Sequence, residues 1–514
     1  MIKVKRAIVS VYDKTGIIEF CRNLRKLGIE IIATGGTARL LKENKVPVKN
    51  VSDVTNFPEI LNGRVKTLHP KILGGILALR EKEEHVSELK KHDIKPIDMV
   101  VSNLYPFEKV TSKEGIQLKE ALENIDIGGP NMIRAAAKNF ENVAVVVDPK
   151  DYDTVLKELK EKGDLSKETR SRLAIEAFRH TAKYDWIIHK FLEKGVSTPI
   201  EFPEVLNLTY KKLQDLRYGE NPHQKAAFYK EFEVKESCVT NAEQLSGKNL
   251  SWTNVLDLNS ALELVKEFDE PTVSIIKHTS PCGVACGTDI FDAFEKAYSS
   301  DPLSAFGGIV GANRKIDLTT AKRMSECHFD AIIAPDFEGD ALQILKKRDV
   351  LILMNTGKLG YGQVKYLDIV NVVGGLLVQE HDNAPLKDLK TVTKIKPTPK
   401  QLDSMMFAWK VVKHVKSNAI VLVKGKRTVG IGMGQTSRVD SVKIAISKAK
   451  DEAKGSIMAS DGFFPFRDSI DEAAKAGIVA IIQPGGSVRD KEVIDAANQL
   501  DIAMVFTGMR CFRH

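Results

Sequence analysis

The stretch A-I-V-S-V-Y-D-K-T-G-I-I-E-F-C-R-N-L-R-K-L-G-I-E-I-I-A-T-G-G-T, residues 7–37, decides the fold. Its apolar runs at residues 7–11 and 29–33 have the length of buried strands. Between them, apolar residues recur with the period of an amphipathic helix: Ile17, Ile18, Phe20, Cys21 and Leu24. The stretch therefore predicts a strand, helix and parallel strand that form one βαβ unit.

The same alternation continues as far as residue 195. A further helix is expected to begin near Ala38, and apolar runs at residues 99–101 and 143–147 predict two more strands. Residues 165–195 follow a helical pattern, and Val196 to Pro203 then break the periodicity. We therefore expect an α/β domain over residues 1–198, with a mostly parallel sheet and helices on both faces.

Residues 199–514 predict a second α/β region. Its expected strands are short apolar runs: 273–276, 309–311, 331–334, 351–353, 419–423, 479–482 and 502–506. The length of this region fits two lobes better than one. A charged, proline-bearing segment at residues 380–401, where the apolar periodicity lapses, is the expected seam.

Composition narrows the functional class. At roughly 150 residues per domain, 514 residues suggest about three domains. The net charge of +8 is small for this length, so nucleic acid is not implied, although an anionic small molecule would fit. The six scattered cysteines, the charges at residues 13 and 14 and the lack of a long apolar stretch predict a cytoplasmic protein that does not cross a membrane.

Two loops of the first domain are expected to meet at one edge of the sheet. Asp13–Gly16 follows the first strand and Thr34–Thr37 follows the second, and glycines at a helix start let backbone N–H groups approach a phosphate. The segment G-R-V-K-T-L-H-P, residues 63–70, adds cations that suit an acidic substrate. Taken alone, each glycine-containing loop could be a tight turn, and the basic segment could be a solvent-exposed loop. The prediction of an anion site therefore depends on finding all three segments together.

Polar segments in the second region also stand beside predicted strands. Lys277 and His278 directly follow the run at residues 273–276, and strand ends often carry catalytic groups. The segment at residues 217–224, R-Y-G-E-N-P-H-Q, and the run at residues 460–468, S-D-G-F-F-P-F-R-D, combine rings with charges. A surface turn and core packing at a kink are the simpler interpretations of these two segments when each is taken alone.

The motifs taken together resemble a known family. Residues 10–14, T-G-G-T, G-R-V-K-T-L-H-P, S-N-L-Y-P-F (102–107) and I-D-I-G-G-P (125–130) with R-A-A-A-K (134–138) are similar to the IMP cyclohydrolase domain of the bifunctional purine-biosynthesis enzymes. R-Y-G-E-N-P-H-Q, K-H-T-S-P-C-G (277–283), D-P-L-S-A-F-G-G (301–308), S-N-A-I-V (417–421) and G-I-G-M-G-Q-T-S-R (430–438) resemble the AICAR transformylase region of that family. The resemblance spans the whole chain.

The resemblance implies a fold and two reactions. A methylglyoxal-synthase-like domain would be followed by two cytidine-deaminase-like lobes. The lobes would transfer a formyl group from 10-formyltetrahydrofolate to AICAR, and the first domain would close the product, FAICAR, to IMP. Family members form homodimers with transformylase sites at the interface. No catalytic metal is implied, although a structural monovalent cation is compatible with the family.

The resemblance also assigns roles to residues. The catalytic set comprises Lys66, Tyr105, Asp126 and Lys138 for cyclisation, and Lys277, His278 and Asn418 for transfer, with His278 as the base. The substrate-binding set comprises Ser10, Lys14, Thr34, Gly35, Gly36, Thr37, Arg64, Thr67, Asn103, Gly128, Arg217, Tyr218, Asp330, Gln435, Arg438, Phe463, Arg510, Phe512 and His514. Arg513 departs from relatives that carry histidine just before the terminal one, which weakens the roles given to Arg510 and His514.

Three alternatives remain open. Pro281 to Cys286 resembles half of a zinc-deaminase motif, but three residues separate its cysteines and no histidine is followed two positions later by glutamate. A methylglyoxal-synthase-like domain would also fit a regulatory protein that binds phosphorylated ligands. One of the two activities could also be lost, leaving a cyclohydrolase or a transformylase alone.

Overall fold

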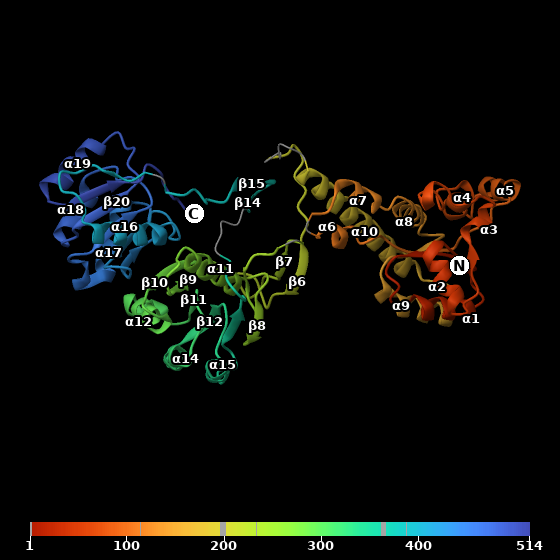
Figure 1. Ribbon diagram of the computed structural model, residues 1–514, viewed down its shortest axis with the longest axis horizontal. Helices are drawn as coiled ribbons and strands as arrows, with labels where there is room; N and C mark the ends of the chain where they lie inside the picture. Colours follow the sequence, from red (N-terminus) through yellow and green to blue (C-terminus); the bar gives the residue numbers. More distant parts are fainter. Residues whose placement is uncertain (1–2, 114, 196–201, 233, 361–365, 387) are drawn as a thin grey trace. The chain divides into compact units, whose positions relative to one another are not determined.

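The computed structural model describes residues 3–113, 115–195, 202–232, 234–360, 366–386 and 388–514. The chain divides into two compact units, Met1–Leu208 and Thr209–His514, drawn red to yellow and yellow-green to blue in Figure 1. The predicted boundary at residues 198 and 199 lies outside the described residues. No helix in the described ranges is long and apolar enough to cross a membrane.

A parallel sheet forms the centre of the first unit. Its strands are β1 (Arg6–Val11), β2 (Glu30–Ala33), β3 (Lys49–Asn50), β4 (Met99–Asn103) and β5 (Ala144–Val146). Their spatial order is β3-β2-β1-β4-β5, and every pair is parallel. The four strands predicted from the apolar runs are confirmed to within one or two residues at their ends.

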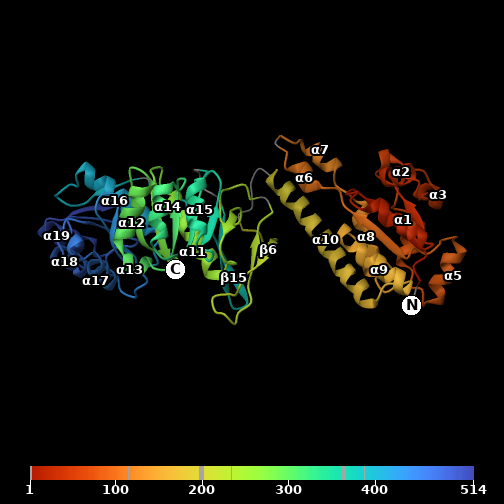
Figure 2. The same ribbon diagram turned by 90° about the horizontal axis from the view of Figure 1, so that it is seen from below.

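Helices cover both faces of this sheet because β1 is apolar on both sides. Ala7, Val9 and Val11 pack into one core with α1 and α9, whereas Ile8 packs into the other with α4, α8 and α10. The long helix α10 lies against α8, as Figure 2 shows. The helices of this unit are α1 (Ile17–Lys26), α2 (Gly35–Glu43), α3 (Val51–Thr55), η1 (Leu61–Gly63), α4 (Pro70–Leu77), α5 (Glu83–Lys91), α6 (Phe107–Thr111), α7 (Leu118–Glu123), α8 (Gly128–Lys138), η2 (Pro149–Asp151), α9 (Tyr152–Lys162) and α10 (Lys167–Lys194).

Helix α2 begins earlier than the sequence pattern predicts. It starts at Gly35, not near Ala38, and the preceding Thr34 has the extended backbone of an N-cap residue. The glycines of T-G-G-T are therefore the first turn of the helix itself. Their free N–H groups point out of the helix at the carboxyl end of β2.

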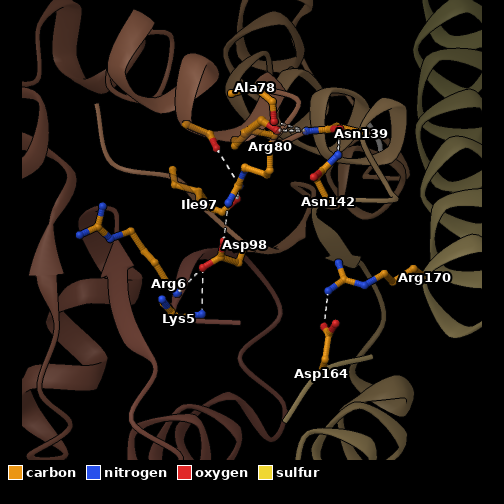
Figure 3. Close-up of polar contacts among 12 residues, drawn as sticks. Lys5, Arg6, Ala78, Arg80, Ile97, Asp98, Asn139, Asn142, Asp164 and Arg170 are labelled. Carbon is orange, nitrogen blue, oxygen red and sulfur yellow. Dashed lines mark hydrogen bonds and ion pairs between the residues drawn. The ribbon is translucent and has the colours of Figure 1, made fainter. Parts of the chain in front are cut away.

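A buried polar network holds the opposite end of the sheet (Figure 3). The Asp98 carboxylate, just before β4, accepts hydrogen bonds from the backbone N–H groups of Lys5 and Arg6 at 2.8 and 2.9 Å. It also pairs with Arg80 at 2.8 Å, and Arg80 donates to the Ile97 carbonyl at 2.9 Å. Asp98 thereby joins the amino-terminal ends of β1 and β4.

The second unit is built around two six-stranded mixed sheets, and β6-β7 and β14-β15 form separate two-stranded sheets. The first has the order β10-β9-β11-β12-β13-β8 and the second β16-β21-β20-β19-β17-β18. The second sheet takes its first strand, β16, from within the segment predicted as a seam. The strands are β6 (Lys211–Asp215), β7 (Ala227–Lys230), β8 (Glu243–Ser246), β9 (Thr272–Lys277), β10 (Ser280–Cys286), β11 (Gly308–Ala312), β12 (Phe329–Ala334), β13 (Ile352–Asn355), β14 (Leu367–Val372), β15 (Gly375–Glu380), β16 (Lys390–Thr391), β17 (Ile420–Val423), β18 (Thr428–Gly432), β19 (Ile457–Ser460), β20 (Ala480–Gln483) and β21 (Ala503–Phe506).

The two lobes share one apolar core. Leu262 of the first lobe and Val412 of the second belong to the same buried cluster. At the junction, the Thr428 hydroxyl of β18 accepts from the Val284 N–H of β10 at 2.9 Å. The helices of this unit are α11 (Trp252–Lys266), α12 (Ile290–Ser300), α13 (Pro302–Ala305), α14 (Leu318–Ser325), α15 (Gly339–Lys346), α16 (Pro399–Val412), α17 (Arg438–Ala449), η3 (Lys450–Ala453), α18 (Asp468–Lys475) and α19 (Asp490–Gln499).

Candidate functional site

A cavity of about 670 Å³ opens in the first unit where β1, β2 and β4 end. Loops after these strands and the start of α8 form its wall. Twelve of the residues predicted for this domain line it: Ser10, Lys14, Thr34, Gly36, Thr37, Arg64, Lys66, Thr67, Asn103, Tyr105, Asp126 and Gly128. The structure therefore brings together loops that are up to 118 positions apart in the sequence, from Ser10 to Gly128.

One side of the cavity is built for an anion. The Lys14 ammonium donates to the Thr37 hydroxyl at 2.8 Å and to the Val11 carbonyl, and burial, together with the charge of Lys66, lowers the pKa of Lys14. The Lys66 ammonium lies 3.9 Å from where a Cβ on Gly35 would stand, beside the start of α2. Two ammonium groups and a helix N-terminus thus converge, which favours a phosphate.

Asp126 lies at the start of α8 on the other side. Its carboxylate accepts from the Gly129 N–H at 2.9 Å, and its own N–H donates to the Tyr184 hydroxyl at 2.7 Å. Burial raises the pKa of Asp126, although the Gly129 N–H and the Lys66 charge oppose this rise. A carboxyl group with a raised pKa can exchange protons closer to neutral pH.

The glycines of I-D-I-G-G-P permit this close packing. A Cβ on Gly128 would stand 2.6 Å from the Thr67 hydroxyl, and one on Gly129 would stand 2.6 Å from the Asp126 carboxylate. Neither contact is sterically possible without movement of the site. These two positions therefore require glycine so that Asp126 and Thr67 can share the cavity wall.

The remaining cavity residues are positioned by polar and ring contacts. The Asn103 side chain accepts from the backbone N–H groups of Tyr12 and Asp13 at 2.7 and 2.9 Å, which fixes the loop after β1. The Tyr105 ring lies edge-on to Tyr12, with 5.5 Å between the centroids. Arg64 forms an exposed ion pair with Glu123, another cavity residue.

Two residues predicted for the first site are not among those that line the cavity. Gly35 is in the first turn of α2 but does not line the cavity. Lys138 is the last residue of α8 and is exposed, whereas the first residue of that helix, Gly128, lines the cavity. Ten residues of helix rise by about 15 Å, so the R-A-A-A-K motif carries Lys138 away from Asp126.

Lys277 and His278 lie at the tip of a hairpin in the second unit. The sequence pattern predicted a strand at residues 273–276, which corresponds to β9, but it did not predict β10, which begins at Ser280, three residues after Lys277. The Lys277 ammonium donates to the Phe306 carbonyl. His278 and Thr279 form the turn, and the Thr279 N–H donates to the Asp257 carboxylate of α11 at 2.6 Å. Sequence reasoning missed Asp257 because no local motif marks it.

Asn418 belongs to a buried polar cluster of the second lobe. Its carbonyl oxygen accepts from Arg438 at 2.8 Å, and its amide donates to the Gln435 carbonyl at 2.9 Å. Arg438 forms an ion pair with Asp461, whose side chain is fully buried. The structure therefore brings the predicted Asn418, Gln435 and Arg438 together and adds Asp461, which lies in the quoted run at residues 460–468.

The C-terminal residues pack against this cluster. A Cβ on Gly462 would stand 2.5 Å from the Arg438 guanidinium and 2.6 Å from the Phe512 ring, so the two groups meet at this glycine. Arg510 lies over the Phe512 ring at 4.6 Å, and His514 lies edge-on to the same ring at 6.0 Å. Phe463 is 42% exposed next to the fully buried Phe464.

Arg513, the position that departs from relatives, reaches the other lobe. Its guanidinium donates to the Ser260 hydroxyl of α11 at 3.4 Å, and burial lowers its pKa. Its backbone carbonyl accepts from Ser417, next to Asn418, at 2.9 Å. Arg513 thus links the Asn418 segment to the first lobe.

The other predicted residues of the second unit make local contacts. Arg217 lies over the Tyr218 ring at 4.7 Å and donates to its hydroxyl at 2.8 Å. Asp330, near the start of β12, pairs with Lys248 at 3.6 Å. These contacts do not connect either pair to Asn418 or His278.

The cysteines of the deaminase-like motif are unsuited to a shared metal. Cys282 and Cys286 lie on β10 but pack into different cores. Burial raises the pKa of Cys282 to about 12 and that of Cys286 to about 11. Because the two side chains enter different cores, they do not converge on one point as the ligands of a shared metal would.

Two family models match the chain. A family model described as "AICARFT/IMPCHase bienzyme" matches residues 136–448, more than half of the chain, and one described as "MGS-like domain" matches residues 16–131. The predicted methylglyoxal-synthase-like fold of the first domain is confirmed. The mixed α/β architecture of the second region agrees with the prediction for it.

Full-length relatives carry the name "Bifunctional purine biosynthesis protein PurH". Those of Caldicellulosiruptor saccharolyticus and Thermoanaerobacter sp. are each 55% identical, over 514 and 512 residues, and that of Acetivibrio thermocellus is 53% identical over 517 residues. Each match covers 99% of this chain and 100% of the relative. The chain therefore belongs to the AICARFT/IMPCHase bienzyme family.

Proposed function

We propose that this chain catalyses the last two steps of IMP synthesis, formyl transfer to AICAR and ring closure of FAICAR. The observation that carries the proposal is the cavity in the MGS-like region. It combines an anion-binding side with a carboxyl group whose pKa is raised. A ribonucleotide matches both features: its phosphate fits the anion-binding side, and its reacting base would lie beside the carboxyl group.

Ring closure needs little more than positioning and proton transfer. The carboxamide nitrogen of FAICAR attacks the formyl carbon, and the formyl oxygen leaves as water after ring formation. With the phosphate at the start of α2, near Lys14 and Thr37, the reacting groups would face Asp126. Asp126 would move the protons, and Tyr105 would polarise the formyl oxygen together with Lys66, whose charge acts on both Lys14 and Asp126 and so lies between the two sides of the cavity. Lys138 has no part in this proposal because it lies at the far end of α8.

Formyl transfer is assigned to the second unit. The AICAR amine attacks the formyl carbon of the donor, His278 takes the amine proton, and the bond from the formyl carbon to the folate nitrogen breaks as that nitrogen gains a proton. Lys277 and the Asn418 amide would stabilise the oxyanion that develops on the formyl oxygen. The donor is a formylated folate, for which we propose 10-formyltetrahydrofolate.

The test uses the full chain and separates the two products. AICAR with 10-formyltetrahydrofolate should yield tetrahydrofolate and IMP, and FAICAR alone should yield IMP. Lys66→Ala should lower cyclisation of FAICAR and spare transfer. His278→Ala should lower transfer by ~10²- to 10⁴-fold and spare cyclisation. Each variant is thus the matched control for the other, and loss of both activities in either one would contradict the assignment of separate sites.

We also propose a homodimer. The hairpin β14–β15 exposes apolar side chains, among them Val370 at 59% and Leu377 at 63% exposed, and exposed apolar patches mark interaction surfaces. A second copy of the chain is the occupant that the family resemblance supports. Leu377→Glu should give a monomer in sedimentation analysis with reduced transfer and normal cyclisation. A Leu377→Glu protein that remains dimeric would remove the hairpin from the interface.

A further inference from the structure

The turn that carries His278 has a backbone conformation that its residues disfavour. His278 and Thr279 have φ values of 55° and 63°, between the paired residues Lys277 and Ser280. A two-residue hairpin turn with both φ values positive is type I′, which favours Asn-Gly. A β-branched residue such as Thr279 rarely adopts a positive φ. The turn therefore needs support from outside its own sequence.

Asp257 supplies a contact of this kind. It lies on α11, 22 residues before Thr279, and its carboxylate accepts from the Thr279 N–H at 2.6 Å. The backbone N–H of His278 also acts on this carboxylate. A charged acceptor forms stronger hydrogen bonds than a neutral one, so the Asp257 carboxylate holds the peptide group of Thr279 within the turn.

Charged groups of both lobes act on the Asp257 carboxylate. Burial raises the pKa of Asp257, and the charges of His278 and Lys416 oppose this rise. Lys416 belongs to the second lobe and precedes Ser417 and Asn418. The carboxylate thus lies at the first lobe's hairpin tip, where the charge of Lys416 in the second lobe also acts on it.

We propose that Asp257 is a positioning residue for formyl transfer: its carboxylate holds the His278–Thr279 turn in the left-handed conformation and so fixes the direction of the His278 side chain. This inference rests on the role proposed for His278. Asp257 itself takes no proton from the substrate. Its effect should therefore appear in kcat for transfer, while KM for AICAR changes little.

The main test compares Asp257→Ala, Asp257→Asn and the double variant Asp257→Ala/Thr279→Gly in the full chain. Asp257→Ala should lower kcat for transfer by ~10²-fold, the effect of misplacing a reacting group. Asp257→Asn keeps an oxygen acceptor and should lose less. Glycine adopts a positive φ without steric cost, so the double variant should recover about tenfold of the loss. If Asp257 only stabilised the fold in general, Thr279→Gly would not restore the kcat lost in Asp257→Ala.

Three controls accompany these variants. Glu263→Ala removes another carboxylate of α11, one that pairs with Lys266 and not with the turn, and should keep kcat within about twofold. Thr279→Gly alone shows the effect of the glycine in the parent. Cyclisation of FAICAR, catalysed in the other unit, should be unchanged in every variant.

The outcomes separate this inference from the function on which it rests. If His278→Ala transfers formyl at a rate within threefold of the parent, the role of His278 fails and the inference falls with it. If His278→Ala is inactive but Asp257→Ala keeps half of the parent's kcat, the inference alone is overturned. If Asp257→Ala is unfolded or inactive and Thr279→Gly restores nothing, the inference is also overturned, because the turn is then not what Asp257 holds.

Discussion

The buried position of Asp126 suits its proposed catalytic role but lowers the stability of the first unit at neutral pH. Its carboxyl group is mostly buried, and burial raises its pKa above the ordinary value of 3.8. A carboxyl whose pKa is raised by folding stabilises the fold only while protonated, so this contribution is lost as pH rises through the folded-state pKa. At neutral pH, the ionised side chain therefore opposes folding of the unit that needs it.

Asp126→Asn should consequently make the first unit more stable and less active. The asparagine keeps an oxygen for the Gly129 N–H but no longer exchanges protons, so cyclisation should fall by ~10²-fold or more. The unfolding temperature should rise at pH 7, and the gain should vanish near pH 3, where the parent carboxyl is protonated. Calorimetry across this range, beside a cyclisation assay, measures both effects. A less stable variant at pH 7 would contradict the argument.

Residue roles could be predicted where the strand pattern alone brings distant residues to the same edge of the sheet. Lys14 and Thr37 follow adjacent parallel strands, so their convergence follows from the strand pattern. Lys138 was placed with Asp126 by a motif, but the helix between them extends away from the cavity. Asp257 could not be predicted because its role depends on the backbone of a turn 22 residues later.

At the scale of elements, buried parallel strands were the most predictable. The runs at residues 7–11 and 29–33 are apolar on both faces because helices cover both sides of the sheet. Strand β10 was missed because its sequence, S-P-C-G-V-A-C, contains a proline and a glycine, which ordinarily mark turns. The register of β10 against β9 shifts between Pro281 and Gly283, and a bulge accommodates such residues within a strand.

The Asp98 network should control the stability of the first sheet but not its chemistry. Asp98→Ala removes two backbone hydrogen bonds and leaves the Arg80 charge without its carboxylate partner, which should lower the free energy of unfolding by about 3–5 kcal/mol. The network lies at the amino-terminal ends of β1 and β4, whereas the cavity lies at their carboxyl ends. Urea denaturation should show the loss, and kcat for cyclisation at low temperature should match that of the parent. A variant with a changed kcat would show that the two ends are coupled.

The contact between α11 and α16 should make the second unit sensitive to acid. Glu267, which follows α11, lies 3.2 Å from the His414 ring nitrogen Nε2 and pairs with Lys413 at 3.4 Å. Although burial opposes them, these partners lower the pKa of Glu267 to about 2. A carboxyl whose pKa is lowered by folding stabilises the fold above its unfolded-state pKa, here by up to about 3 kcal/mol.

Glu267→Gln tests this assignment. The parent's stabilisation should be lost as pH falls from about 4.5 to about 2, so parent and variant should differ at pH 7 and converge near pH 2. Denaturation of the second unit, followed at several pH values, measures the difference. A constant difference at all pH values would mean that packing, not ionisation, is what the glutamate contributes.

For the whole molecule, the division into two units predicts separable activities. Every cavity residue lies before residue 130, and both cores of the first unit are complete within Met1–Leu208. A fragment of residues 1–208 should therefore fold and cyclise FAICAR with a kcat/KM within about threefold of the full chain. A fragment that ends at residue 198, the predicted boundary, is the useful comparison. A folded fragment without activity would place part of the site in the second unit.

The shared core of the second unit has a mechanical consequence. Strand β10 pairs with β9 in its own sheet and also bonds to Thr428 of β18 in the other. Force applied to one lobe is thus carried directly into the other, and neither lobe can be drawn out without exposing the core that both share. Stretched from its two ends in an optical trap, the chain should extend in two abrupt steps, one for each unit, and not in three.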